Sequence, residues 1–183
     1  MSPVNDATLF LLNTLFGLYA YALIARFLLQ ALRVDFYNPL AQFVWKVSNP
    51  VVRPAQAVIP RWRRYDLATL LVLWLWLLIN IALVLAVLGV PLSPAIALLA
   101  VAKMLVLLIN FYTFAILIQA VMSWFGAAMH GPAASLLYTL NEPLLRPVRR
   151  VLPPIGGLDL SPLLVIIALQ VLSRLIPLAY VLR

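Results

Sequence analysis

Four long apolar blocks constrain this chain more than any other feature of its sequence. They cover residues 8–32, 67–90, 101–125 and 160–182. Each is long enough to cross a hydrocarbon core about 30 Å thick, which takes roughly 20 apolar residues in a helix. The composition agrees, since 66% of the residues are hydrophobic and 10% are charged, against about 25% charged in soluble domains. The sequence predicts an all-α membrane protein with four transmembrane helices.

Basic residues fall on one side of these blocks. Nine of the thirteen Lys and Arg residues lie in the segments 33–66 and 126–159, whereas the segment 91–100 has none. The positive-inside tendency therefore predicts that both basic loops are cytoplasmic and that both termini are periplasmic. No basic residue precedes the first block and Asp6 stands there instead, so we expect this block to stay attached rather than to act as a signal peptide.

The chain contains an internal repeat. A shift of 93 positions without a gap superimposes Pro39 on Pro132, Pro50 on Pro143, Arg53 on Arg146, Pro54 on Pro147, Pro60 on Pro153 and Asp66 on Asp159. We interpret this as a tandem duplication with units 1–93 and 94–183, each a helix-loop-helix. Because two crossings return the chain to its starting side, the two repeats are expected to be parallel.

Each basic loop also carries a helix signal. Asn38 can cap a helix that begins at Pro39, and Leu40, Phe43 and Val47 follow at helical spacing. This amphipathic pattern predicts a short interfacial helix on the cytoplasmic face. We expect Pro50, and Pro143 in the second unit, to end it, because a residue before proline avoids helical geometry.

The two loops carry a pair of related strings, which run from Asn49 to Pro60 (NPVVRPAQAVIP) and from Glu142 to Pro153 (EPLLRPVRRVLP). In these strings the chain resembles the YggT family, also called YlmG, as two copies over nearly its whole length. The resemblance implies a small multi-pass protein of the bacterial inner membrane or of plastids. Family members are linked to osmotic tolerance, division-gene neighbourhoods, plastid nucleoid distribution and maturation of cytochrome b-type complexes, with no family-wide enzymatic activity.

The duplicated Pro-x-x-Arg-Pro element is the most specific local motif. Arg53 and Arg146 could bind a lipid phosphate or a partner's carboxylate through their planar guanidinium groups. Alternatively, each arginine pairs with the aspartate thirteen residues on, Asp66 or Asp159. We favour the ion pair, because partly buried charges are usually paired within the chain. The two aspartates are also predicted to cap the following helices.

Further basic residues are candidates for lipid or partner contact. Those in the first unit are Arg61, Arg63 and Arg64, interleaved with Trp62, and those in the second are Arg149 and Arg150. Such a cluster can recognise anionic lipid head groups. It can equally be an anchor that fixes topology at head-group depth, and the sequence leaves both interpretations open.

Polar residues inside the apolar blocks are functional candidates, because their burial is costly. Arg26, Asn80 and Asn110 are the main ones. The asparagines could also serve as hydrogen-bonding links between helices. Arg26 and Lys103 fall near enough to a membrane face for their long side chains to snorkel.

No constellation for catalysis, cofactor binding or metal binding is predicted. The chain has no cysteine and His130 is its one histidine, so a metal or haem site built from these residue types is not expected. We expect a non-enzymatic protein that scaffolds or assists assembly of a membrane complex in the cell envelope; the alternative is an osmotic-stress-linked ion or solute conduit. The expected partners are the bilayer with its anionic lipids, an unidentified membrane protein and further copies of the chain, with no direct contact to nucleic acid.

Overall fold

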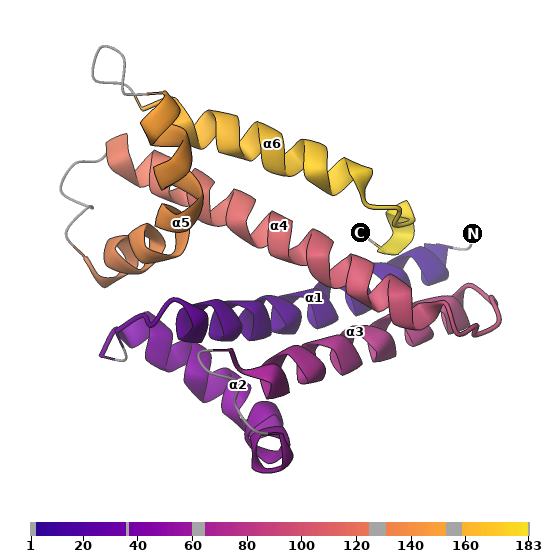
Figure 1. Cartoon of the computed structure of the whole chain (residues 1–183). Coiled ribbons are helices and arrows are strands. Elements are labelled where there is room, and N and C mark those ends of the chain that lie inside the picture. The colour runs from indigo at the N-terminus through magenta and orange to yellow at the C-terminus, as the bar shows by residue number, and fades with distance from the viewer. Residues whose placement is uncertain (1–2, 36, 60–64, 125–130, 153–158, 183) are drawn as a thin grey trace.

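A computed structural model describes residues 3–35, 37–59, 65–124, 131–152 and 159–182. Within these ranges the chain forms six α-helices, followed by the 3-10 turn η2 (Tyr180–Leu182) (Figure 1). The helices are α1 (Pro3–Ala31), α2 (Pro39–Val58), α3 (Leu67–Val87), α4 (Ile96–Trp124), α5 (Pro132–Val151) and α6 (Ser161–Leu175). The all-α prediction is confirmed by these helices.

Three of the helices are long and apolar enough to cross a membrane: α1, α3 and α4. Helix α4 begins at Ile96, five residues before the predicted start of its block. The fourth block is apolar, but α6 has only 15 residues, or about 22 Å at 1.5 Å per residue. It ends at Leu175 because the residue before Pro177 adopts an extended backbone.

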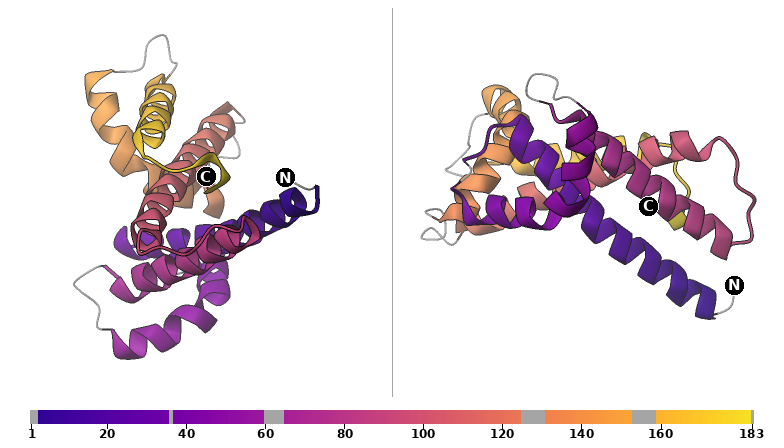
Figure 2. Two further views of the ribbon diagram at one scale, coloured as in Figure 1. Left: turned by 90° about the vertical axis from the view of Figure 1, so that its right-hand side faces the viewer. Right: turned by 90° about the horizontal axis from the view of Figure 1, so that it is seen from below.

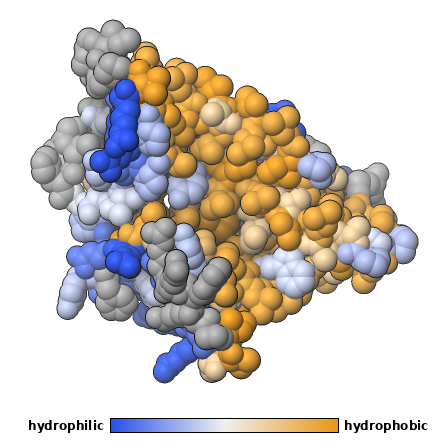
Figure 3. Space-filling view, in the orientation of Figure 1, coloured by the Kyte–Doolittle hydropathy of each residue, from blue (hydrophilic) through white to orange (hydrophobic). Residues whose placement is uncertain are grey.

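Several polar side chains are buried inside the bundle, and many large apolar side chains are exposed on its outside. The side chains of Asn80 and Arg26 are 0% and 1% exposed, whereas Phe10 is 68% exposed. Large apolar side chains cover the outer flanks of the long helices, as the space-filling view shows on one face (Figure 3). This is the arrangement expected when the surrounding solvent is lipid and polar groups must pair internally.

The predicted helix starts are confirmed in the first repeat. Asn38 precedes Pro39 and its side chain accepts a hydrogen bond from the Leu40 amide at 3.0 Å. Asp66 caps α3 and accepts from the Thr69 hydroxyl at 2.6 Å. Both caps satisfy amides that lack a helical partner.

The predicted ends of the amphipathic helices are wrong. Helix α2 continues through Pro50 and Pro54 to Val58, and α5 continues through Pro143 and Pro147 to Val151. Each proline removes one amide donor and bends the helix without ending it; the bend of α5 is visible in Figure 1. Apolar residues beyond the prolines, such as Val52 and Leu145, are fully buried, and this packing keeps both helices going.

The long helices pack into one bundle. Helix α3 packs against α1 and α4, and α4 also packs along α6. Helices α2 and α5 contact each other and lie at one end of the molecule, whereas both termini lie at the other end (Figures 1 and 2). Hydrophilic residues gather at the end formed by α2 and α5 (Figure 3).

Candidate functional site

The polar end of the molecule is built on the two proline-containing helices. On α2, Arg53 is exposed and lines an open hollow of about 510 Å³ together with Lys46, Asn49, Pro50 and Pro54. Two prolines four residues apart also leave helical carbonyls without amide donors on this face. The hollow therefore offers two cations and an amide side chain within a rigid, bent frame.

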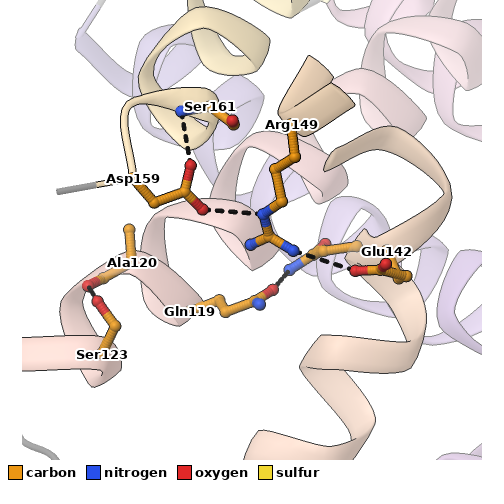
Figure 4. Close-up of polar contacts among 8 residues, drawn as sticks. Gln119, Ala120, Ser123, Glu142, Arg149, Asp159 and Ser161 are labelled. Carbon is orange, nitrogen blue, oxygen red and sulfur yellow. Dashed lines mark hydrogen bonds and ion pairs between the residues drawn. The ribbon is translucent and has the colours of Figure 1, made fainter. Parts of the chain in front are cut away.

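Arg146, the equivalent residue on α5, is exposed as well. Its predicted partner Asp159 instead pairs with Arg149, whose Nε lies 2.9 Å from Asp159 Oδ2. The Arg149 Nη1 also lies 3.1 Å from Glu142 Oε2, so one guanidinium joins two carboxylates (Figure 4). This network ties α5 to the start of α6.

Asp159 is held as a carboxylate by its surroundings. Partial burial raises its pKa, but hydrogen bonds from Ser161 and Arg149 and the charge of Arg149 together bring the pKa below its ordinary value. The Ser161 amide donates to Asp159 Oδ1 at 2.9 Å, which places the carboxylate beside the first residue of α6. The N-cap position itself is Leu160, which makes no side-chain cap bond, so the prediction that Asp159 caps this helix is one residue off.

The same contact exists in the first repeat without the positive charge. Gln56, which corresponds to Arg149 at a shift of 93, donates from Nε2 to Asp66 Oδ2 at 2.5 Å. Asp66 is only 1% exposed. The aspartate's partner is thus ten residues upstream in both repeats, and the repeat alignment could have identified Gln56 and Arg149 as the pair.

Arg26 is buried where α1 meets α2. Its Nη1 donates to Ser48 Oγ at 2.9 Å and to Asn49 Oδ1 at 2.8 Å, and its guanidinium carbon lies 4.4 Å from the centre of the Trp45 ring. Stacking of this kind stabilises a cation in a low-dielectric setting. The expectation that Arg26 snorkels to the surface is therefore wrong.

The second repeat uses neutral groups at the equivalent positions. Gln119 replaces Arg26 and Asn141 replaces Ser48. The Asn141 Nδ2 donates to Gln119 Oε1 at 2.7 Å (Figure 4), so the long apolar helix and the amphipathic helix are joined at the same point in both repeats.

A second polar cluster joins the repeats inside the bundle. Lys103 on α4 is 3% exposed and donates to Asn80 Oδ1 on α3 at 2.6 Å and to Asn13 Oδ1 on α1 at 2.9 Å. Asn13 donates in turn to the Val181 carbonyl at 3.0 Å. Lys103 thus points inward rather than to the membrane surface. Asn110, also on α4, lies near Tyr21 of α1.

Some predicted site residues lie outside the described part of the chain, namely Pro60, Arg61, Trp62, Arg63, Arg64 and Pro153, as does the one histidine, His130. Arg150 is described and exposed. Over the described ranges, no group of three or more His, Cys, Asp and Glu side chains could hold a metal ion.

Comparisons with known proteins identify the family of the chain. The family model CCB3/YggT matches residues 5–88 and again residues 89–180. A Pseudomonas aeruginosa relative, "Uncharacterized protein PA0392", is 35% identical over 96% of this chain and 91% of its own length. The Escherichia coli protein YggT is 39% identical over 90% of this chain and 86% of its own.

A more distant likeness covers less than half of the chain. "YlmG homolog protein 2, chloroplastic" of Arabidopsis thaliana is 38% identical over 43% of this chain and 31% of its own length. No solved structure matches the chain. Because the family unit matches twice and the bacterial relatives are similar over almost the whole length, the chain belongs to the CCB3/YggT family as a tandem pair of its units.

Proposed function

We propose that the protein is a non-enzymatic, multi-pass protein of the bacterial inner membrane that scaffolds or assists assembly of a membrane complex. Its contact surface is the polar end formed by α2 and α5. The observation that carries the proposal is the exposure of Arg53 and Arg146 on two proline-bent helices at one end of the bundle.

Three features support this role. The polar networks around Arg26, Lys103 and Arg149 join helices to one another, so their polar atoms serve to hold the frame. The basic side chains of α2 are free of these networks and face a hollow. A rigid frame with an outward-facing basic surface suits recognition of acidic groups on a neighbouring protein.

The proposal includes a topology. Four crossings, with α6 as a short fourth span, place α2 and α5 on the cytoplasmic side and both termini in the periplasm. The chain has no cysteine, so single cysteines at Arg53 and Arg146 can be labelled by an impermeant maleimide without background. We expect both to react from the cytoplasmic side and Ala95→Cys, in the α3–α4 connection, to react from the periplasm. Labelling of positions 53 and 146 from opposite sides would refute the topology.

The function is tested by photo-crosslinking in native membranes. A photoreactive residue at position 53 should capture one discrete membrane protein, and Lys46→Glu in the same chain should abolish the product. The control is the same residue at Leu163, which is exposed on α6. The rival function, an ion or solute conduit, predicts flux from liposomes that hold the purified protein. Flux above protein-free liposomes, with no crosslink at position 53, would refute the scaffold role.

A further inference from the structure

An apolar slot lies between the two repeats. It encloses about 310 Å³ and its walls come from α1, α2, α4 and α5. Six of its lining residues form three equivalent pairs at the shift of 93: Tyr21 and Phe114, Ala25 and Ile118, Val44 and Leu137. The slot is therefore made by the association of the repeats, at the end of the bundle where α2 and α5 begin. Its size lies at the small end of ligand pockets, which fits one hydrocarbon chain.

A polar hollow of about 450 Å³ adjoins the slot. Pro39 and Ser135 line the hollow, whereas the next residues along the chain, Leu40 and Leu136, line the slot. The Asn38 Nδ2 donates to the Pro132 carbonyl at 2.7 Å and joins the repeats at this boundary. An apolar slot with a polar mouth is an amphipathic site.

Arg33 lines this mouth and has an unfavourable backbone conformation. Its φ is 55°, in the left-handed region that favours glycine. It ends α1 in a turn in which the Val34 amide bonds the Leu29 carbonyl at 2.9 Å. The equivalent residue of the second repeat is Gly126, the residue type that this turn usually has. Arginine accepts this less favourable backbone conformation while its side chain lines the mouth of the slot.

The mouth carries one charge of each sign. Arg33 and Asp35 are both exposed and line the same hollow. In the described part of the chain the ion pairs are those of Arg149, so Arg33 and Asp35 do not pair with each other. The Asp35 carboxylate accepts from the Tyr37 amide at 3.0 Å and keeps further acceptor capacity. A ligand head group that bears both an anion and a cation complements this mouth.

We propose that this cleft between the repeats binds one phospholipid with a phosphoethanolamine head group. One acyl chain fills the slot, the phosphate contacts the Arg33 guanidinium, and the primary ammonium donates to Asp35. Asn38, Ser135 and Thr139 add polar groups around the head group. A choline head group has no N–H to donate to the carboxylate, and a glycerol head group has no cation. The proposal is independent of the scaffold role, because it concerns what the repeats hold between them.

Native mass spectrometry of the full-length protein in mild detergent tests the proposal. After delipidation, the protein is titrated with phosphatidylethanolamine, phosphatidylcholine or phosphatidylglycerol of identical acyl chains. We expect one phosphatidylethanolamine per chain, bound at least about tenfold more tightly than the others, since each charged hydrogen bond contributes roughly one order of magnitude. Equal binding of the three lipids would overturn the assignment. A protein that binds none of the three, for example because it forms a dimer, would overturn it as well.

Variants locate the site. Arg33→Gly suits the left-handed backbone, so it should fold at least as well as the parent while it loses phosphatidylethanolamine about tenfold or more. Arg53→Gln removes an exposed charge on another face and should bind normally. Ala25→Phe fills the slot and should abolish binding, whereas Leu163→Phe on an exposed flank should not. Unchanged binding by Arg33→Gly, or by a folded Ala25→Phe, would show that the lipid lies elsewhere.

Discussion

The buried Lys103 provides the sharpest test of how the two repeats are joined. Its ammonium donates to the side-chain oxygens of Asn80 at 2.6 Å and Asn13 at 2.9 Å, and these neutral oxygens hold the charge inside the bundle. Asn80→Leu removes the shorter bond and keeps the branched shape of the side chain. We expect this substitution to cost much more when the lysine is present than when it is replaced by methionine.

The magnitudes follow from the contacts. A hydrogen bond to a charged group contributes about 1.5–3 kcal/mol, which Asn80→Leu loses in the parent protein. In the Lys103→Met background only the 3.4 Å bond from Asn80 to the Leu12 carbonyl is left to lose, and such bonds between membrane helices average about 0.6 kcal/mol. Because Asn80→Leu loses that weaker bond in both backgrounds, it cancels in the cycle, and the coupling free energy between the two positions is about 1.5–3 kcal/mol. Lys103→Met alone should be nearly neutral, because about 2.5–3.5 kcal/mol of insertion cost disappears with the charge.

A double-mutant cycle measured by reversible unfolding in bicelles gives this coupling directly. The matched control is Asn110→Leu, since Asn110 is also a polar residue of α4 and lies seven residues along the helix from Lys103. Its coupling to Lys103→Met should be within about 0.5 kcal/mol of zero. A coupling of zero for Asn80 would show that its amide does not stabilise the lysine, and the account of the cluster would be wrong.

Three further predictions concern the polar end. The pKa of Asp159 is below its ordinary value, so the stability that its carboxylate contributes is complete above the ordinary pKa and is lost as the pH falls through the folded pKa. Asp159→Asn should therefore be less stable than the parent at pH 6 by up to about 1 kcal/mol, and this difference should narrow as the pH is lowered below the ordinary pKa of an aspartate, as measured by thermal unfolding; a constant difference would contradict the linkage. Arg149→Gln should cost less than about 1 kcal/mol in the same assay, since Gln56 already makes the equivalent contact, and a loss above 2 kcal/mol would oppose this view. Asn38→Ala should cost about 1–2 kcal/mol of stability, because both the helix cap and the hydrogen bond to Pro132 are lost. Asn38→Gly keeps a residue that is favourable at the cap position, so its cost measures the bond between the repeats alone. If neither variant lowers the stability, both contacts are refuted.

The parts of the fold that depend on neighbouring residues were predictable from the sequence. The Asn38–Pro39 start of α2 and the Asp66 start of α3 follow from local hydrogen bonding, and the structure has both. The ends of α2 and α5 were not predictable in this way. A proline weakens a helix locally, but burial of Val52 and Leu145 beyond it is a tertiary effect that no local rule contains.

The error at the helix ends explains the error in the ion pair. If α5 ended at Pro143, Arg146 would lie in a loop and could reach Asp159. Because α5 runs on to Val151, the chain turns back beside Arg149, one helical turn later, and this residue meets the carboxylate. The inward direction of Lys103 has a similar cause, since α4 begins at Ile96 and carries the lysine two turns into the bundle.

The two repeats keep the same contact points and exchange the charges placed there. The contact between the long helix and the amphipathic helix is cationic in the first repeat, through Arg26, and neutral in the second, through Gln119. The contact to the helix-starting aspartate is neutral in the first repeat, through Gln56, and cationic in the second, through Arg149. A hydrogen bond is present at both contact points in both repeats, so the geometry of the unit requires a charge at neither contact point. At these two contact points each repeat thus has one buried or half-buried cation, Arg26 or Arg149, in addition to Lys103 inside the bundle. Exposed basic side chains such as Arg33, Lys46, Arg53 and Arg146 stay available on the surface for ligands and partners.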